Sequence, residues 1–121
     1  MAEDNLTELN HANLKDPKIT DFQKKHLPKA VASAKPVKGK AITVKVDVGE
    51  KAYGVAHPNE DGHWIQWINL YAGDVLLANA DFTPMVSEPS VTFTIKLKKD
   101  AQVTAIARCN LHGDWEAPVT Y

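Results

Sequence analysis

Apolar and polar residues alternate with a period of two along much of the chain after residue 40. Residues 42 to 48 read Ile-Thr-Val-Lys-Val-Asp-Val, and residues 91 to 97 read Val-Thr-Phe-Thr-Ile-Lys-Leu. Such alternation is typical of a strand with one face in a core and the other in water. We therefore predict a β-strand over each of these two segments.

A third segment, residues 64–71, is apolar on both faces apart from Gln66 and Asn69. It predicts a central strand, or one that a partner subunit covers. Further strands are predicted over 75–82, 102–109 and 118–121. Several short strands separated by turn residues indicate an all-β fold, an immunoglobulin-like antiparallel β-sandwich.

The first 40 residues lack this alternation. Residues 1–22 are polar and predict a short helix or an irregular N-terminal arm, while residues 23–40 predict a lysine-rich loop broken by Pro28, Pro36 and Gly39. A chain of 121 residues is long enough for one hydrophobic core. We therefore divide it into an arm, 1–22, and one β-sandwich domain, 23–121.

Charge and hydropathy exclude some classes of function. The chain has 14 Lys+Arg against 15 Asp+Glu, which argues against a nucleic-acid partner bound through bulk positive charge. No apolar run approaches the ~20 residues of a membrane-spanning helix, so no membrane partner is expected. The acidic start lacks the layout of a signal peptide, and we expect a cytoplasmic location.

The candidate chemistry comes from one cysteine and several histidines. Cys109 ends a predicted strand and His112 follows it by three residues, while His57 lies in a turn and His63 precedes the strand at 64–71. Each residue alone is more often a packing or surface residue than a ligand. Together, at strand ends and in loops on one side of a sandwich, they make a metal site plausible.

Three segments carry a resemblance to a known family. They read Phe22-Gln-Lys-Lys-His26-Leu-Pro28, Ala56-His57-Pro-Asn-Glu-Asp-Gly-His63-Trp-Ile-Gln-Trp-Ile68 and Cys109-Asn-Leu-His112-Gly-Asp-Trp115. This pattern resembles the superoxide reductases of the one-iron, neelaredoxin type, which are related to the C-terminal domain of desulfoferrodoxin. The resemblance covers residues 22–121. Two-iron relatives carry an additional four-cysteine domain, which a chain with one cysteine cannot form.

The resemblance implies one iron per chain, alternating between Fe²⁺ and Fe³⁺. Its equatorial ligands would be the histidines at 26, 57, 63 and 112, and its axial ligand would be Cys109, with the opposite position open. Imidazoles and a thiolate are suitable ligands for such an iron, and backbone N–H groups near residues 110–113 could hydrogen-bond the sulfur. His11 has no counterpart in the family and is expected to be an ordinary surface residue.

The implied activity is the one-electron reduction of superoxide to hydrogen peroxide, with electrons from an external donor such as rubredoxin. Lys25 matches a family lysine that lies beside the open position, where its charge would attract the superoxide anion. We also expect a homotetramer, because one-iron relatives often form one and because the segment 64–71 is apolar on both faces.

One position departs from the family pattern. Many members have a glutamate two residues before the first histidine, where it closes onto the oxidised iron, but this chain has Lys24. We expect the oxidised site to stay five-coordinate, or to take water, hydroxide or another carboxylate such as that of Glu60. Catalysis should survive this replacement.

Two other classes of protein also fit part of this pattern. A cupredoxin-like electron carrier is also a β-sandwich with a His, Cys and His site, but it generally has a methionine soon after the last histidine. No methionine follows His112. The other class is a metal-free immunoglobulin-like scaffold module, which would bind metal only substoichiometrically.

Overall fold

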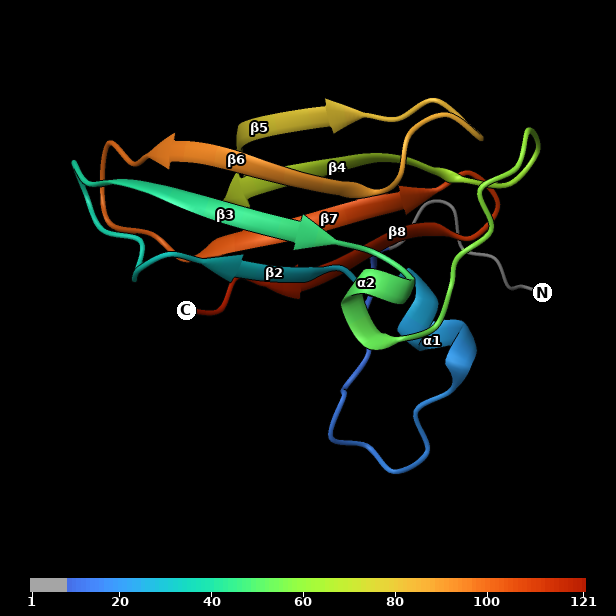
Figure 1. Ribbon diagram of the computed structural model, residues 1–121. Coiled ribbons are helices and arrows are strands. Elements are labelled where there is room, and N and C mark those ends of the chain that lie inside the picture. The colour runs from blue at the N-terminus through green and yellow to red at the C-terminus, as the bar shows by residue number, and fades with distance from the viewer. Residues whose placement is uncertain (1–8) are drawn as a thin grey trace.

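The computed structural model describes residues 9–121, which form a two-layer β-sandwich (Figure 1). One layer has five strands in the order β1-β8-β7-β4-β5, and the other has three in the order β2-β3-β6. The elements are β1 (Leu9–Asn10), α1 (Asp21–His26), β2 (Lys29–Ala32), β3 (Ala41–Asp47), α2 (Glu50–Tyr53), β4 (Ile65–Ala72), β5 (Val75–Asp81), β6 (Ser90–Lys96), β7 (Val103–Cys109) and β8 (Gly113–Pro118).

The core lies between the two sheets and follows the predicted alternation. In the small sheet β3 and β6 are antiparallel, with Val44 opposite Phe93 and Ile42 opposite Ile95, and all four side chains are buried. In the large sheet every second residue of β7, from Val103 to Cys109, is buried. The predicted all-β sandwich is confirmed, and from residue 9 onward helix contributes only two short segments.

Strand β4 occupies the interior of the large sheet, between β7 and β5. The register against β7 shifts between Ile65 and Trp67, so that Ile65 and Ile68 both point into the core although they are three positions apart. A bulge of this kind locally breaks the period of two. The sequence prediction that this apolar segment forms a central strand is therefore confirmed.

The prediction of a loop over residues 23–40 is wrong for part of that segment. Its first residues complete α1, and Lys29–Ala32 form β2, which pairs with β3. The inward residues of β2 are Ala30 and Ala32. Two alanines bury little apolar surface, so among lysines and prolines they give a weak strand signal.

The last predicted strand is also misplaced. The strand that follows Cys109 is β8, Gly113–Pro118, whereas we predicted one over 118–121. Pairing extends into the final residues through a hydrogen bond of 2.9 Å from the Val119 N–H to the Val103 carbonyl and through an isolated bridge between Val31 and Thr120. Strand β8 contains Gly, Asp, Glu and Pro, which are poor strand formers, and it is held by its pairing with β7.

Helix α1 begins at a capping box. The backbone N–H of Gln23 donates to Thr20 Oγ1 at 3.2 Å, and the Thr20 N–H donates to Gln23 Oε1 at 3.0 Å. Pro28, two residues after the helix, cannot continue its hydrogen-bond ladder. Since α1 runs across residue 22, the division of the chain at that position stays a prediction.

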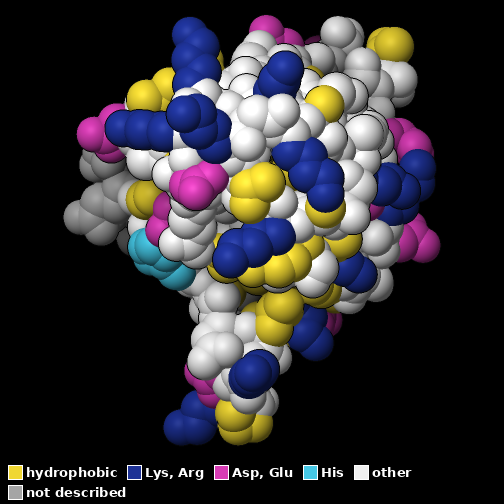
Figure 2. Space-filling model, turned by 90° about the vertical axis from the view of Figure 1, so that its left-hand side faces the viewer, with side chains coloured by type: hydrophobic (Ala, Val, Ile, Leu, Met, Phe, Trp, Pro, Cys, Tyr) yellow, Lys and Arg dark blue, Asp and Glu magenta, His cyan; other side chains and the backbone are white. Residues whose placement is uncertain are grey.

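Both helices lie at the same end of the sandwich, where β4 begins and β7 ends (Figure 1). The opposite end faces the viewer in Figure 2, and positively charged side chains are spread over it. The lysine-rich segment is thus divided, with Lys24 and Lys25 on α1 and the lysines after β2 at the far end. None of the described helices is long and apolar enough to cross a membrane.

Candidate metal site

His26 is the last residue of α1 and is completely buried. Its Nδ1 lies 2.6 Å from the carbonyl oxygen of Phe22, one helical turn earlier. Because a carbonyl only accepts hydrogen bonds, Nδ1 carries the proton and the lone pair of Nε2 is free. The short helix therefore fixes both the position of the imidazole and its tautomer.

His57 and His63 both lie in the segment that leads into β4, with residues 58–62 between them. His57 Nδ1 is 2.7 Å from the carbonyl oxygen of Pro58, which again leaves Nε2 without a proton. His63 is held by a narrow turn, in which its backbone exchanges hydrogen bonds of 2.9 and 3.1 Å with that of Glu60. Two histidines six residues apart are thereby placed at the same end of the sandwich.

Cys109 is the last residue of β7 and has no exposed surface. Its sulfur lies 3.6 Å from His112 Nδ1, on the turn between β7 and β8. Burial raises the pKa of the Cys109 thiol, and the backbone N–H groups of Leu111 and His112 act against that rise. Strand β7 thus places the sulfur on the side of the site that faces the core.

The four histidines form a closed ring of neighbours. Ring centroids are 4.8 Å apart for His26 and His57, 4.9 Å for His57 and His63, 5.2 Å for His63 and His112, and 5.0 Å for His112 and His26. Neighbouring rings are inclined by 66° to 80°. Four imidazoles so arranged can direct one nitrogen each toward a common centre.

The tightest group within this arrangement contains three histidines and the cysteine. One ligand atom from each of His26, His63, Cys109 and His112 lies within 4.8 Å of all the others. His57 is outside this group, although its ring contacts those of two members. His11, by contrast, is 66 % exposed and pairs with Glu116, as expected of a surface residue.

The donor atoms fit a metal ion rather than an internal hydrogen-bond network. The Nε2 atoms of His26, His57 and His63 are buried and have no hydrogen-bond partner among residues 9–121. Buried polar atoms are nearly always paired, so three unpaired nitrogens together require another explanation. A cation coordinated by nitrogen and sulfur would satisfy all three, and His/Cys donor sets suit iron, zinc or copper.

Burial keeps these imidazoles neutral. Desolvation lowers the pKa of His26 from 6.5 to about 3 and that of His57 to about 4, with neighbouring charges adding to the effect. Desolvation also lowers the pKa of His63 and raises the pKa of the Cys109 thiol, although the backbone N–H groups oppose that rise. The histidines can therefore offer lone pairs at neutral pH.

Lys25 places a positive charge near the site. Its charge contributes to lowering the pKa of His57 and His63, after the larger effect of burial. Its Nζ lies 5.7 Å from the centroid of the Phe22 ring, and that ring also contacts His26 and His112, at 4.6 and 4.9 Å. One half-exposed aromatic residue thus adjoins the lysine and two histidines.

Asn110 is a supporting residue that the sequence analysis did not identify. Its Oδ1 accepts from the Trp64 N–H at 2.9 Å and its Nδ2 donates to the Gly62 carbonyl at 2.8 Å. These bonds join the turn after Cys109 to the backbone on both sides of His63. Its position within the Cys-Asn-Leu-His motif could have drawn attention to Asn110. The motif does not predict, however, which backbone groups the amide side chain hydrogen-bonds.

Fold and site together define a β-sandwich protein with a histidine and cysteine metal-binding cluster at one end. The sequence profile of the desulfoferrodoxin family matches residues 18–118. The chain belongs to this family. The family resemblance noted in the sequence is therefore confirmed, and the cupredoxin-like and scaffold alternatives lose their main support.

Named relatives agree with this placement. The putative superoxide reductase of Methanocaldococcus jannaschii is 39% identical over 101 residues, covering 80% of this chain and 82% of the relative. The superoxide reductase of Thermococcus kodakarensis is 33% identical over 91 residues, covering 68% and 76%. The solved superoxide reductase (neelaredoxin) of Ignicoccus hospitalis superimposes with a TM-score of 0.63 at 42% identity, covering 78% and 80%.

We predict that the metal-free protein loses stability as the pH falls from about 6.5 toward 4. Unfolded imidazoles titrate near 6.5, whereas His26 and His57 titrate near 3 and 4 when folded. The unfolded chain therefore binds more protons in this window, and acid favours unfolding. Urea unfolding at pH 7 and pH 5 measures the effect. Replacing both residues, His26→Gln and His57→Gln, should flatten this dependence, and an unchanged slope would contradict the assignment.

Proposed function

We propose that this protein is a superoxide reductase, which reduces superoxide to hydrogen peroxide at one iron atom per chain. The observation that carries the proposal is the ring of four imidazoles, three with buried unpaired Nε2 atoms, beside a buried cysteine sulfur. Family membership and the names of the relatives support the same reaction.

The proposed ligands are the four histidines at 26, 57, 63 and 112 together with Cys109. His57 completes the set because its Nε2 is buried and unpaired and its ring adjoins those of His26 and His63. Four neutral imidazoles and one thiolate leave a small net positive charge with iron, which suits an anionic substrate. Bound iron supplies the chemistry, in which Fe²⁺ gives one electron to superoxide and two protons complete hydrogen peroxide.

Lys25 is proposed to attract the superoxide anion to the site. An ammonium group close to a partly buried centre raises the local concentration of anions and stabilises negative charge there. The position of Lys25 on the last turn of α1, directly before His26, supports this role. The contact between its Nζ and the Phe22 ring holds the charge near the histidines.

An external donor must return the electron, and rubredoxin is the donor proposed from the family resemblance. A homotetramer and a cytoplasmic location also stay predictions. The large sheet offers a surface for contact between subunits, because Val75 and Leu76 on β5 are 61% and 53% exposed. Tyr71 on β4 lies opposite Leu76 and extends this apolar surface.

Cys109→Ser should abolish the visible absorption of the oxidised iron protein and remove most of its reaction with superoxide. Serine cannot supply a thiolate, and its hydroxyl is a poor ligand at neutral pH. Stopped-flow mixing with superoxide, combined with metal, peroxide and oxygen analysis, provides the measurement. Reduction yields one peroxide per superoxide without oxygen, so oxygen evolution by the intact protein would indicate dismutation instead.

Ala107→Ser is a matched control for that variant. Residue 107 lies two positions earlier on β7, on the same buried face, so the substitution adds a buried hydroxyl without removing the sulfur. The control should keep both its absorption and its reaction. If the two variants behave alike, the loss comes from disturbed packing and the role of the sulfur is contradicted.

Lys25→Ala should slow the second-order reaction with superoxide by about tenfold at low ionic strength. The difference from the unmodified protein should shrink as salt screens the charge. Lys24→Ala serves as the control, because it removes the same charge one residue further from His26. Equal losses in the two variants would show a general charge effect and contradict a specific role for Lys25.

Glu60 is the proposed substitute for the missing glutamate at position 24. Its backbone pairs with that of His63, and its charge opposes the lowering of the His63 pKa by burial. Glu60→Gln should therefore shift the absorption of the oxidised protein while leaving the reduced protein's reaction with superoxide within about twofold. Asp61→Asn is the control. An unshifted spectrum would exclude Glu60 as a ligand.

A further inference from the structure

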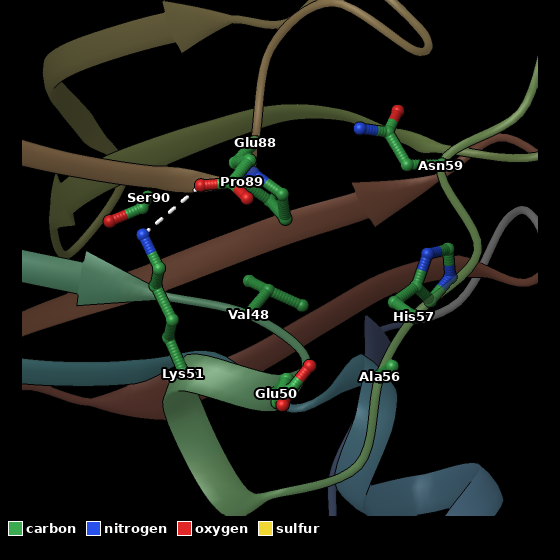
Figure 3. A pocket seen from close by; sticks show the side chains of 9 residues that line it. All are labelled: Val48, Glu50, Lys51, Ala56, His57, Asn59, Glu88, Pro89 and Ser90. Carbon is green, nitrogen blue, oxygen red and sulfur yellow. Dashed lines mark hydrogen bonds and ion pairs between the residues drawn. The ribbon is translucent and has the colours of Figure 1, made fainter.

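His57 lies on a segment that has little protein behind it. Residues 55–59 run along the edge of an open hollow of about 540 Å³, which Figure 3 shows from close by with His57 and Asn59 on the same stretch of chain. Across the hollow are Lys51, on α2, and Glu88, before β6, which form a salt bridge of 3.1 Å. Because the segment borders an open hollow on this side, contacts elsewhere must fix the position of His57.

Gly49 provides one of these contacts. It is a buried residue between β3 and α2, with a φ of 88° that favours glycine. A Cβ placed on it would lie 3.1 Å from the backbone nitrogen of His57 and 3.4 Å from its Cβ. A side chain at position 49 would require the neighbouring backbone of His57 to shift by a few tenths of an ångström, in addition to the strain of the positive φ.

Asn59 provides the other contact, two residues after the histidine. Its Nδ2 donates to the Ser87 carbonyl at 3.0 Å, and its Oδ1 accepts from the Met85 N–H at 2.8 Å. The side chain therefore ties the segment to the loop before β6. The segment around His57 is thus contacted at two points. Gly49 lies against the histidine itself, and Asn59 joins the segment to the loop before β6.

We infer that Gly49 and Asn59 are positioning residues, which place the His57 imidazole so that it closes the ring of ligands. His26 is built into a helix and Cys109 into a strand, and both are fully buried, whereas the backbone of His57 lies in a loop whose contacts include these two. The inference rests on the proposed role of His57 as a ligand. According to this inference, two residues that do not bind the metal contribute to the affinity of the site for it.

Gly49→Ala should weaken metal binding by about tenfold or more, the loss expected when support around a ligand is disturbed. The probe is Co²⁺, with affinity measured by competition with a chelator and the ligand set followed by absorption. Gly54→Ala is the matched control, because Gly54 also has a positive φ of 79° and borders the same helix, but a Cβ there meets nothing within 4 Å. It should bind Co²⁺ within about twofold of the unmodified protein.

Asn59→Ala provides an independent test if Gly49→Ala does not fold. It should also weaken Co²⁺ binding by about tenfold. Asn59→Asp, which keeps the acceptor for Met85 but loses the donor to Ser87, should fall between. Unchanged affinity in both Asn59 variants would overturn the role of this residue.

A double-mutant cycle with His57→Ala separates positioning from general destabilisation. Without the imidazole, adding Gly49→Ala should change Co²⁺ affinity by less than about twofold. If it still weakens binding tenfold, Gly49 acts on the whole site and the inference is wrong. If His57→Ala alone leaves Co²⁺ affinity unchanged, His57 is not a ligand and the inference is wrong. The proposed reaction is tested separately by the Cys109→Ser variant, so the two failures can be told apart.

Discussion

Burial of unpaired imidazole nitrogens is the constraint on which this end of the molecule depends. Three Nε2 atoms are buried and lack hydrogen-bond partners within the described part of the chain, and leaving such groups unsatisfied costs roughly 1–3 kcal/mol each. A cation bound by all of them removes that cost, and its binding energy then stabilises the fold as well as the site. The same burial keeps the imidazoles neutral. Burial therefore makes the metal-free site unfavourable and also leaves its nitrogen lone pairs able to bind a metal.

The proposed ligands differ in how rigidly the fold holds them. Cys109 ends a strand in the interior of the large sheet, and Asn110 joins the turn that follows it to the backbone around His63. His26 has its proton fixed by a bond to the preceding helical turn. His57 is in a loop supported from two sides, so the arrangement combines a rigid sulfur and three well-supported imidazoles with one that is more easily displaced.

Much of the fold was predictable because burial acts on a simple period. The strands around Val44 and Phe93 alternate strictly, and their inward residues form the core. Strands β2 and β8 were missed because alanine, glycine and proline carry little signal and because pairing with neighbours, which the sequence does not display, holds them in place. The family motifs named the histidines and the cysteine that the structure brings together at one end of the sandwich. Gly49 and Asn110 were not predictable, because they act through contacts between segments distant in the sequence.

The complete enclosure of Cys109 has a chemical consequence for durability. Thiolates are oxidised to sulfenic acid by peroxide when they are accessible, and the proposed reaction makes peroxide at every turnover. The sulfur lies at the core end of the site with no exposed surface, and small apolar residues of β7 lie on its own face of the strand. Its shelter allows an electron-rich sulfur to remain beside the oxidant it helps to generate, without a second cysteine to repair it.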